Sequence, residues 1–186
     1  MLPYILIGLA VLVIGFIAFV ASRPGDFRMS RSTVVNAPAE ACFEQVNDLR
    51  NWDAWTPWNK FDPDAKHTLE GPPAGVGAVS KWSGNNKIGE GIMTIVESKP
   101  GALVRLKLQF IRPMKQTNTG EFAFQSLGPD QTKVTWSMSG VNGFMGKAFH
   151  LFMDCDKMIG GEFENGLASM KRIVESTPSR VPVGSN

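Results

Sequence analysis

The chain opens with a long apolar run that contrasts with the mixed pattern after it. Residues 1–22 contain no charged side chain, and Leu2 to Ala21 provide about 20 mostly apolar residues, enough to cross a hydrocarbon core of ~30 Å as a helix. A cleaved signal peptide is the alternative, but it needs a basic segment that Met1 to Tyr4 do not supply. The pattern predicts one uncleaved transmembrane helix over residues 1–22.

A short linker, residues 23–28, leads from this helix into one domain that is predicted to span residues 29–176. Residues 29–35 are rich in Ser, Thr and Val and predict a first strand. Asn36 is a suitable N-cap and Pro38 fits a first helical turn, so a helix is expected to follow.

Three tryptophans come next, and their spacing places them on one side of a short helix. Trp52, Trp55 and Trp58 recur at steps of three until Pro57 interrupts the helix. The three indoles either pack the helix onto a sheet or line the mouth of a cavity. Trp55 and Trp58 are retained as candidates for the second role.

From residue 76 the hydrophobic period changes to two. Short Gly- and Pro-containing turns separate the alternating segments, which predicts an antiparallel meander. The expected strands are Val76–Trp82, Ile88–Glu97, Leu103–Ile111, Gln116–Phe124 and Lys133–Gly140. In the third, Leu106, Leu108 and Phe110 alternate with polar residues, as in a strand with one buried face.

The last predicted element is one long helix from about Gly143 to Ser176. Its apolar residues recur at steps of three and four, so one stripe should face the sheet. This stripe comprises Phe152, Cys155, Ile159, Phe163, Leu167, Met170 and Val174. Residues 177–186, with Pro and Gly, are predicted to be a disordered tail.

Two glycines, Gly160 and Gly161, lie inside this helix, where each costs roughly 0.8–1 kcal/mol relative to alanine. The pair either lets the sheet approach closely or leaves room for a ligand.

Asp154 and Asp156 are expected on a solvated face near a helix start.

Charge and cysteine content narrow the class of protein. Charged residues are 19% of the chain and the net charge is +2, which argues against nucleic acid as a partner. Cys42 and Cys155 lie far apart and are expected to be reduced, structural thiols.

Arg23, Arg28 and Arg31 follow the apolar run, so the positive-inside rule places the domain in the cytoplasm.

Candidates for acid-base or metal chemistry are few. Glu90 lies between Gly89 and Gly91, and strand alternation turns it away from the face of these glycines, toward solvent. The glycines themselves leave room for a ligand or mark a bulge or bend. His67 and His150 lack partners at metal-ligand spacing, so the sequence predicts no metal site, no cofactor and no catalytic constellation.

The order of elements and three local sequences resemble a known superfamily. Trp52 to Trp58, Gly89 to Gly91 and Lys157 to Leu167 are similar to bacterial polyketide cyclase/dehydrase-like members of the START-like, or SRPBCC, superfamily. This resemblance implies an α+β, Bet v 1-like helix-grip fold, in which a curved antiparallel sheet wraps around a long C-terminal helix. It also implies a ligand cavity between the two, although fold alone does not give function.

The favoured hypothesis is a single-pass membrane protein that binds a hydrophobic small molecule or lipid in this cavity. The alternatives are a cyclase or dehydratase acting on an apolar substrate and an accessory subunit of a larger membrane complex. The expected ligand-binding residues are Trp55, Trp58, Trp82, Met93, Leu108, Phe110, Phe122, Phe124, Trp136, Met138, Phe152, Ile159, Gly160 and Phe163.

Overall fold

The computed structural model describes residues 2–177. In chain order the elements are α1 (Leu2–Ser22), β1 (Asp26–Val35), α2 (Ala39–Asn47), the 3-10 helices η1 (Leu49–Ala54) and η2 (Pro57–Lys60), β2 (Lys66–Glu70), β3 (Val79–Ser83), β4 (Glu90–Lys99), β5 (Leu103–Arg112), β6 (Gln116–Gly128), β7 (Gln131–Val141), α3 (Phe144–Phe152) and α4 (Cys155–Ser176).

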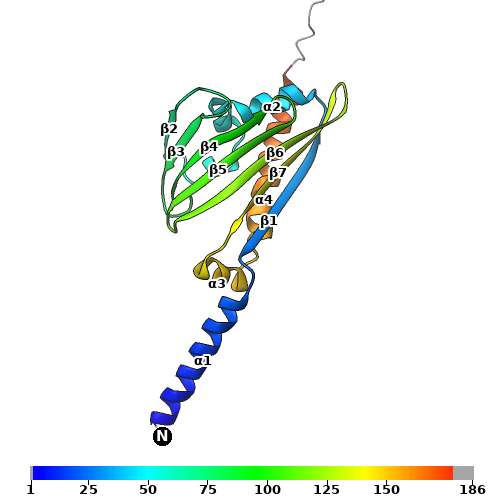
Figure 1. The fold of residues 1–186 in the computed structure, drawn as a ribbon. Helices are drawn as coiled ribbons and strands as arrows, with labels where there is room; N and C mark the ends of the chain where they lie inside the picture. Colours follow the sequence, from blue (N-terminus) through cyan, green and yellow to red (C-terminus); the bar gives the residue numbers. More distant parts are fainter. Residues whose placement is uncertain (1, 178–186) are drawn as a thin grey trace, which may run out of the picture.

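Helix α1 projects from the rest of the protein (Figure 1). Its segment Pro3–Ser22 is long and apolar enough to cross a membrane, and only 6% of the residues in its apolar window are buried. Residues 23–25 connect it to β1, which begins at Asp26. The strand therefore starts three residues before the predicted one, and the linker is shorter than residues 23–28.

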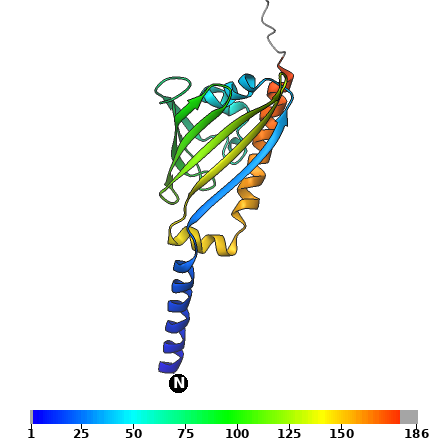
Figure 2. The ribbon, with the colours of Figure 1, turned by 45° about the vertical axis from the view of Figure 1, so that its right-hand side comes forward.

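The seven strands form one antiparallel sheet in the order β1-β7-β6-β5-β4-β3-β2. The sheet curves, and α4 runs along its concave side (Figure 2). This arrangement confirms the predicted helix-grip fold. We call the side facing α4 the inner face.

The core is made by side chains of the inner face of the sheet and side chains of α4, which pack against each other. The ring of Trp136 on β7 stacks on that of Phe163 on α4, with centroids 4.1 Å apart and planes 6° apart. Gly166 permits this contact, because a Cβ at this position would lie 2.8 Å from the Trp136 ring. Helix α4 thus lies close to the sheet at this point.

Two parts of the fold differ from the sequence prediction. Strand β2 was not predicted, because its five residues are all exposed and carry no apolar alternation. The predicted single C-terminal helix is two helices, α3 and α4. Met153 is extended, and the carboxylate of Asp154 accepts a hydrogen bond from the Lys157 amide, which caps the start of α4.

Helix starts and ends also shift. Helix α2 follows Pro38 at its N-cap, not Asn36. The side-chain oxygen of Asn36, which would cap a helix, instead accepts a hydrogen bond from Gln131 Nε2 at 3.2 Å. The tryptophan segment forms η1 and η2 rather than one helix. The predicted disordered tail falls outside the described residues except for Thr177.

Candidate functional site

The inner face has two ends, and the one near α2 is filled with aromatic rings. We call it the α2 end. Trp52 lies 4.7 Å from Trp55 between ring centroids, and Phe122 lies 4.8 Å from Trp136. The two indoles from η1 and its C-cap donate to backbone carbonyls of α2, that of Trp52 to Val46 and that of Trp55 to Gln45. These tryptophans pack the short helices onto the sheet.

The opposite end, which adjoins α1, carries apolar side chains that are only half-buried. We call this the α1 end and define it by Phe27, Trp82, Leu108, Phe110, Gln116 and Asn118. The strand register places Leu108 beside Asn118, and Phe110 beside Gln116. Leu108, Phe110 and Trp82 all remain partly exposed. The apolar contacts there are incomplete, as expected at a binding surface.

A buried amide lies within this end. Asn118 is 6% exposed, and its Oδ1 accepts a hydrogen bond from Gln116 Nε2 at 2.9 Å. Its own Nδ2 donates to Met138 Sδ at 3.8 Å. Because a thioether sulfur is a weak acceptor, the Asn118 amide can donate to a carbonyl or hydroxyl oxygen of a ligand.

Gly91 on β4 has a structural role beneath this surface. The register between β4 and β5 shifts between Glu90 and Gly91, which favours the bulge among the alternatives that the sequence left open. A Cβ on Gly91 would lie 2.3 Å from the ring of Trp82, so Gly91 makes room for this indole. Glu90 is directed toward Arg112, with Oε2 3.0 Å from its Nε.

A pocket of about 660 Å³ opens at the β1 edge of the α1 end. The first residues of β1 form one wall, and the corner between α3 and α4 forms the other. The rings of Phe27 and His150 lie across from each other with centroids 6.1 Å apart. The pocket is lined by Asp26, Phe27, Arg28, Met29, His150, Leu151, Phe152, Met153, Asp154, Cys155 and Asp156.

The two acidic side chains at the α3–α4 corner of this pocket, Asp154 and Asp156, already have partners. The Asp154 carboxylate caps α4, and Asp156 binds Arg31. Burial raises the pKa of the Cys155 thiol, which keeps this group protonated and a poor nucleophile.

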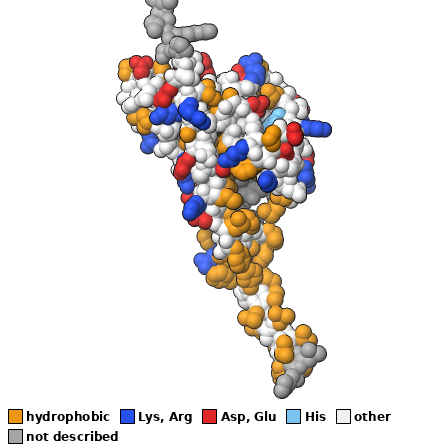
Figure 3. All heavy atoms as spheres, turned by 180° about the vertical axis from the view of Figure 1, so that it is seen from behind, with side chains coloured by type: hydrophobic (Ala, Val, Ile, Leu, Met, Phe, Trp, Pro, Cys, Tyr) orange, Lys and Arg blue, Asp and Glu red, His pale blue; other side chains and the backbone are white. Residues whose placement is uncertain are grey.

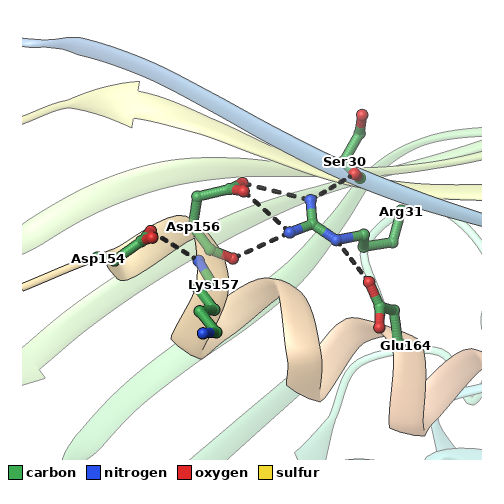
Figure 4. Close-up of polar contacts among 6 residues, drawn as sticks. All are labelled: Ser30, Arg31, Asp154, Asp156, Lys157 and Glu164. Carbon is green, nitrogen blue, oxygen red and sulfur yellow. Dashed lines mark hydrogen bonds and ion pairs between the residues drawn. The ribbon is translucent and has the colours of Figure 1, made fainter.

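Arg31 on β1 joins the sheet to α4 (Figure 4). Its Nη2 lies 2.9 Å from Asp156 Oδ2, and its Nε lies 2.8 Å from Glu164 Oε1. Hydrogen bonding to Arg31 holds the pKa of Asp156 below its ordinary value. Asp156 is therefore an ion-pair partner and not only part of a solvated face.

The two glycines of α4 differ in their surroundings. A Cβ on Gly160 would lie 2.2 Å from Arg31 Nη2, whereas a Cβ on Gly161 would meet open space. Gly160 thus makes room for the Arg31 guanidinium rather than for a ligand. The spacing of residues along α4 does not predict this role, because Arg31 lies on β1, far away in the sequence.

Apart from Gly160, the predicted ligand-binding residues fall into three groups. Those in the packed core are Trp55, Met93, Phe122, Phe124, Trp136, Met138 and Phe163. Those half-buried beside it are Trp58, Trp82, Leu108, Phe110 and Ile159. Phe152 lies apart on α3 and lines the pocket.

Asn118 and Gln116 were missed by the sequence analysis, although a signal for them exists. The alternation that turns Phe122 and Phe124 inward also turns Gly120, Asn118 and Gln116 inward. The pocket was missed because its wall lies at a helix break that was not predicted.

The prediction for the two cysteines agrees with the structure. Cys42 and Cys155 are free and buried, and desolvation raises the pKa of Cys42 to about 11. His67 and His150 are both exposed. Within residues 2–177, no cluster of His, Cys, Asp or Glu has the composition to hold a metal ion.

Solved structures share this fold at low sequence identity. The Zhui aromatase/cyclase from Streptomyces sp. R1128 matches with a TM-score of 0.54 at 13% identity, over 81% of this chain and 94% of its own. Ara h 8.0201 matches with a TM-score of 0.55 at 10% identity, over 82% and 100%. These identities establish the fold alone.

A larger protein also contains the fold. The di-domain ARO/CYC BexL from the BE-7585A biosynthetic pathway matches with a TM-score of 0.58 at 16% identity, over 86% of this chain but 53% of its own. This chain therefore spans about half of that protein.

No curated protein matches the chain. The family model described as "Polyketide cyclase / dehydrase and lipid transport" matches residues 26–175, which run from the start of β1 almost to the end of α4. The chain belongs to the polyketide cyclase / dehydrase and lipid transport family.

Proposed function

We propose that this protein binds a hydrophobic small molecule or lipid at the α1 end of the inner face, while α1 tethers it to a membrane. The observation that carries the proposal is the buried Asn118 amide beside half-buried Leu108 and Phe110. A few polar groups within an apolar surface are typical of sites that bind and orient apolar ligands. The family description, which includes lipid transport, supports the same class of ligand.

Contacts between α1 and the domain support a retained anchor rather than a cleaved leader. Val20 is 0% exposed, and Lys147 Nζ on α3 donates to the Ala21 carbonyl at 3.2 Å. Loss of α1 would uncover the surface against which Val20 packs and would leave Lys147 without this acceptor. Helix α1 therefore also packs against the domain.

The charges at this end of α1 support a cytoplasmic domain. Arg23 follows the helix directly, and Lys147 comes to the same place from a distant part of the chain. Basic residues close to the end of a span favour the cytoplasmic side.

Photoaffinity labelling tests the binding site. The full chain in phosphatidylcholine nanodiscs is incubated with a diazirine-bearing palmitate, irradiated, and mapped by mass spectrometry. We expect labelled peptides from β5 and β6. Leu108→Trp, which fills the site, should lower their labelling several-fold.

Ile111→Trp is the matched control, because Ile111 lies on the same strand with its side chain exposed on the other face. This variant should label as the parent does. Labelling confined to α1 and α3 and unchanged in Leu108→Trp would overturn the proposed site, since it would report only probe dissolved in the bilayer.

Orientation is tested with an introduced cysteine, because Cys42 is buried and a poor target for thiol reagents. Thr119 is exposed on the outer face of β6. In intact cells, Thr119→Cys should resist a membrane-impermeant maleimide and react only after lysis. Reaction before lysis would place the domain outside the cytoplasm.

A further inference from the structure

Helix α3 exposes large apolar side chains to an unusual extent. Every residue of this helix is at least partly exposed. Phe152 is 77% exposed and Met145 is 65% exposed, and Phe144 and Phe149 are exposed as well. A short helix of a water-soluble domain normally buries one apolar face against its own core.

Neighbouring residues extend the apolar surface of α3. Val141 precedes the helix, and Met153 and Met158 follow it, all of them exposed. Figure 3 shows hydrophobic side chains gathered at this end of the domain and continuing along α1. Contiguous apolar patches of this kind mark surfaces that contact a membrane or another protein.

The position of α3 relative to α1 distinguishes between these partners. The rings of Phe16 and Phe152 have centroids 6.4 Å apart. Phe16 lies seven residues before Arg23, which corresponds to about 10 Å along a helix axis. With α1 across a bilayer and Arg23 at its polar boundary, Phe152 lies at the depth of the upper acyl chains, where interfacial helices insert their apolar faces.

Charges around this surface fit a lipid headgroup layer. The Arg23 guanidinium lies 4.3 Å from the Phe19 ring centroid, and Lys147 reaches the end of α1. Lys157 is exposed just beyond the α3–α4 corner. Basic side chains at the rim of an apolar surface can remain among the headgroups while the apolar part inserts.

We propose that α3 is an interfacial helix that seats the domain on the lipid bilayer, with Phe152 and its apolar neighbours inserted beside α1. This inference rests on the proposed tether. It also deepens the proposed function: residues 150–152 form part of both α3 and the pocket wall, so the pocket opens at the membrane surface. The ligand class is then an amphiphile that enters from the bilayer rather than from water.

Fluorescent labels in the full chain test this arrangement. Phe152→Cys and Met145→Cys are labelled with an NBD fluorophore and reconstituted into phosphatidylcholine vesicles, with Thr119→Cys on the outer sheet face as the control. The parent chain measures background labelling, because Cys42 and Cys155 are buried. Melting of each variant verifies folding. We expect blue-shifted emission at positions 145 and 152, strong quenching by lipids with a doxyl group at acyl carbon 5, and several-fold weaker quenching by aqueous iodide than at position 119.

Carbonate extraction of the same vesicles separates the two proposals. If the chain stays in the membrane and the label at position 152 is quenched by iodide as strongly as that at position 119, α3 lies in water and this inference is wrong while the tether stands. A label shielded from both quenchers would show that protein covers α3, which also overturns it. Release of the chain by carbonate would overturn the tether and this inference together.

Discussion

The two ends of the inner face share the same alternating strands but differ in what covers them. At the α2 end, η1 and α4 place Trp52 and Phe163 against the sheet rings, and the side chains interlock. At the α1 end, Leu108 and Phe110 project from the same strand that places Leu106 in the core. The difference shows that burial is decided by the opposing elements and not by the strand pattern. One sheet can therefore provide both a packed core and an apolar surface that is only half-buried.

Phenylalanine truncations should separate the two ends most strongly. Phe163→Ala removes a fully packed ring and should cost about 3–5 kcal/mol. For a protein of this size, such a loss lowers Tm by roughly 10 °C or more. Phe110→Ala removes a half-buried ring and should cost about 1–2 kcal/mol, while it weakens palmitate labelling.

Thermal unfolding of the full chain in mild detergent, followed by near-UV circular dichroism, measures both variants. Equal losses of stability with unchanged labelling would show that the α1 end is ordinary core.

Alanine substitutions at the two glycines of α4 should change stability by smaller amounts, with opposite signs at the two positions. Gly161→Ala gains helix propensity in open space and should stabilise by about 0.8–1 kcal/mol, seen as a rise in Tm of about 2–4 °C. Gly160→Ala places a Cβ against Arg31 and displaces the guanidinium from its carboxylates. We expect its Tm to lie below that of Gly161→Ala. The reverse order would show that the Arg31 contact does not restrict α4.

The smallest expected effect concerns the Arg31–Asp156 pair. Because Arg31 lowers the pKa of Asp156, the ionised carboxylate stabilises the fold above about pH 4, the ordinary range for Asp. This contribution is lost as pH falls through the lowered pKa. Asp156→Asn should therefore lower Tm slightly at pH 7 and leave it unchanged near pH 2.

Arg31→Gln is the control, since it removes the same pair from the sheet side. It should reduce the effect of Asp156→Asn at pH 7. A constant effect of Asp156→Asn across this pH range would instead show that the effect does not depend on the charge of this carboxylate.

Sequence patterns predicted the architecture because most of its strands and helices have their own local pattern of apolar and polar residues. The period-two segments from residue 76 onward and the stripe containing Phe163 and Leu167 determined the sheet and its helix. The edge strand β2 was missed because its exposed residues need no apolar alternation. The break between α3 and α4 was missed because the apolar spacing continues across it, although Asp154 is a good N-cap residue.

The candidate site was less predictable, because periodicity identifies an inward face but not what lies opposite. Trp55 and Leu108 both match the pattern of inward apolar residues, yet only Leu108 lies at the half-buried end. The role of Gly160 depends on Arg31, a residue 129 positions earlier in the sequence. Such pairings arise only when the chain folds.

The brevity of the connection between α1 and β1 limits where this protein can work. Four Cα steps of about 3.8 Å separate Ser22 from Asp26, a reach of at most about 15 Å. With α1 in a bilayer, the domain cannot travel through the aqueous phase between separate membranes as a free carrier would. Any exchange of cargo must then occur by lateral diffusion, in two dimensions, with donors and acceptors that share its membrane or come directly to its surface.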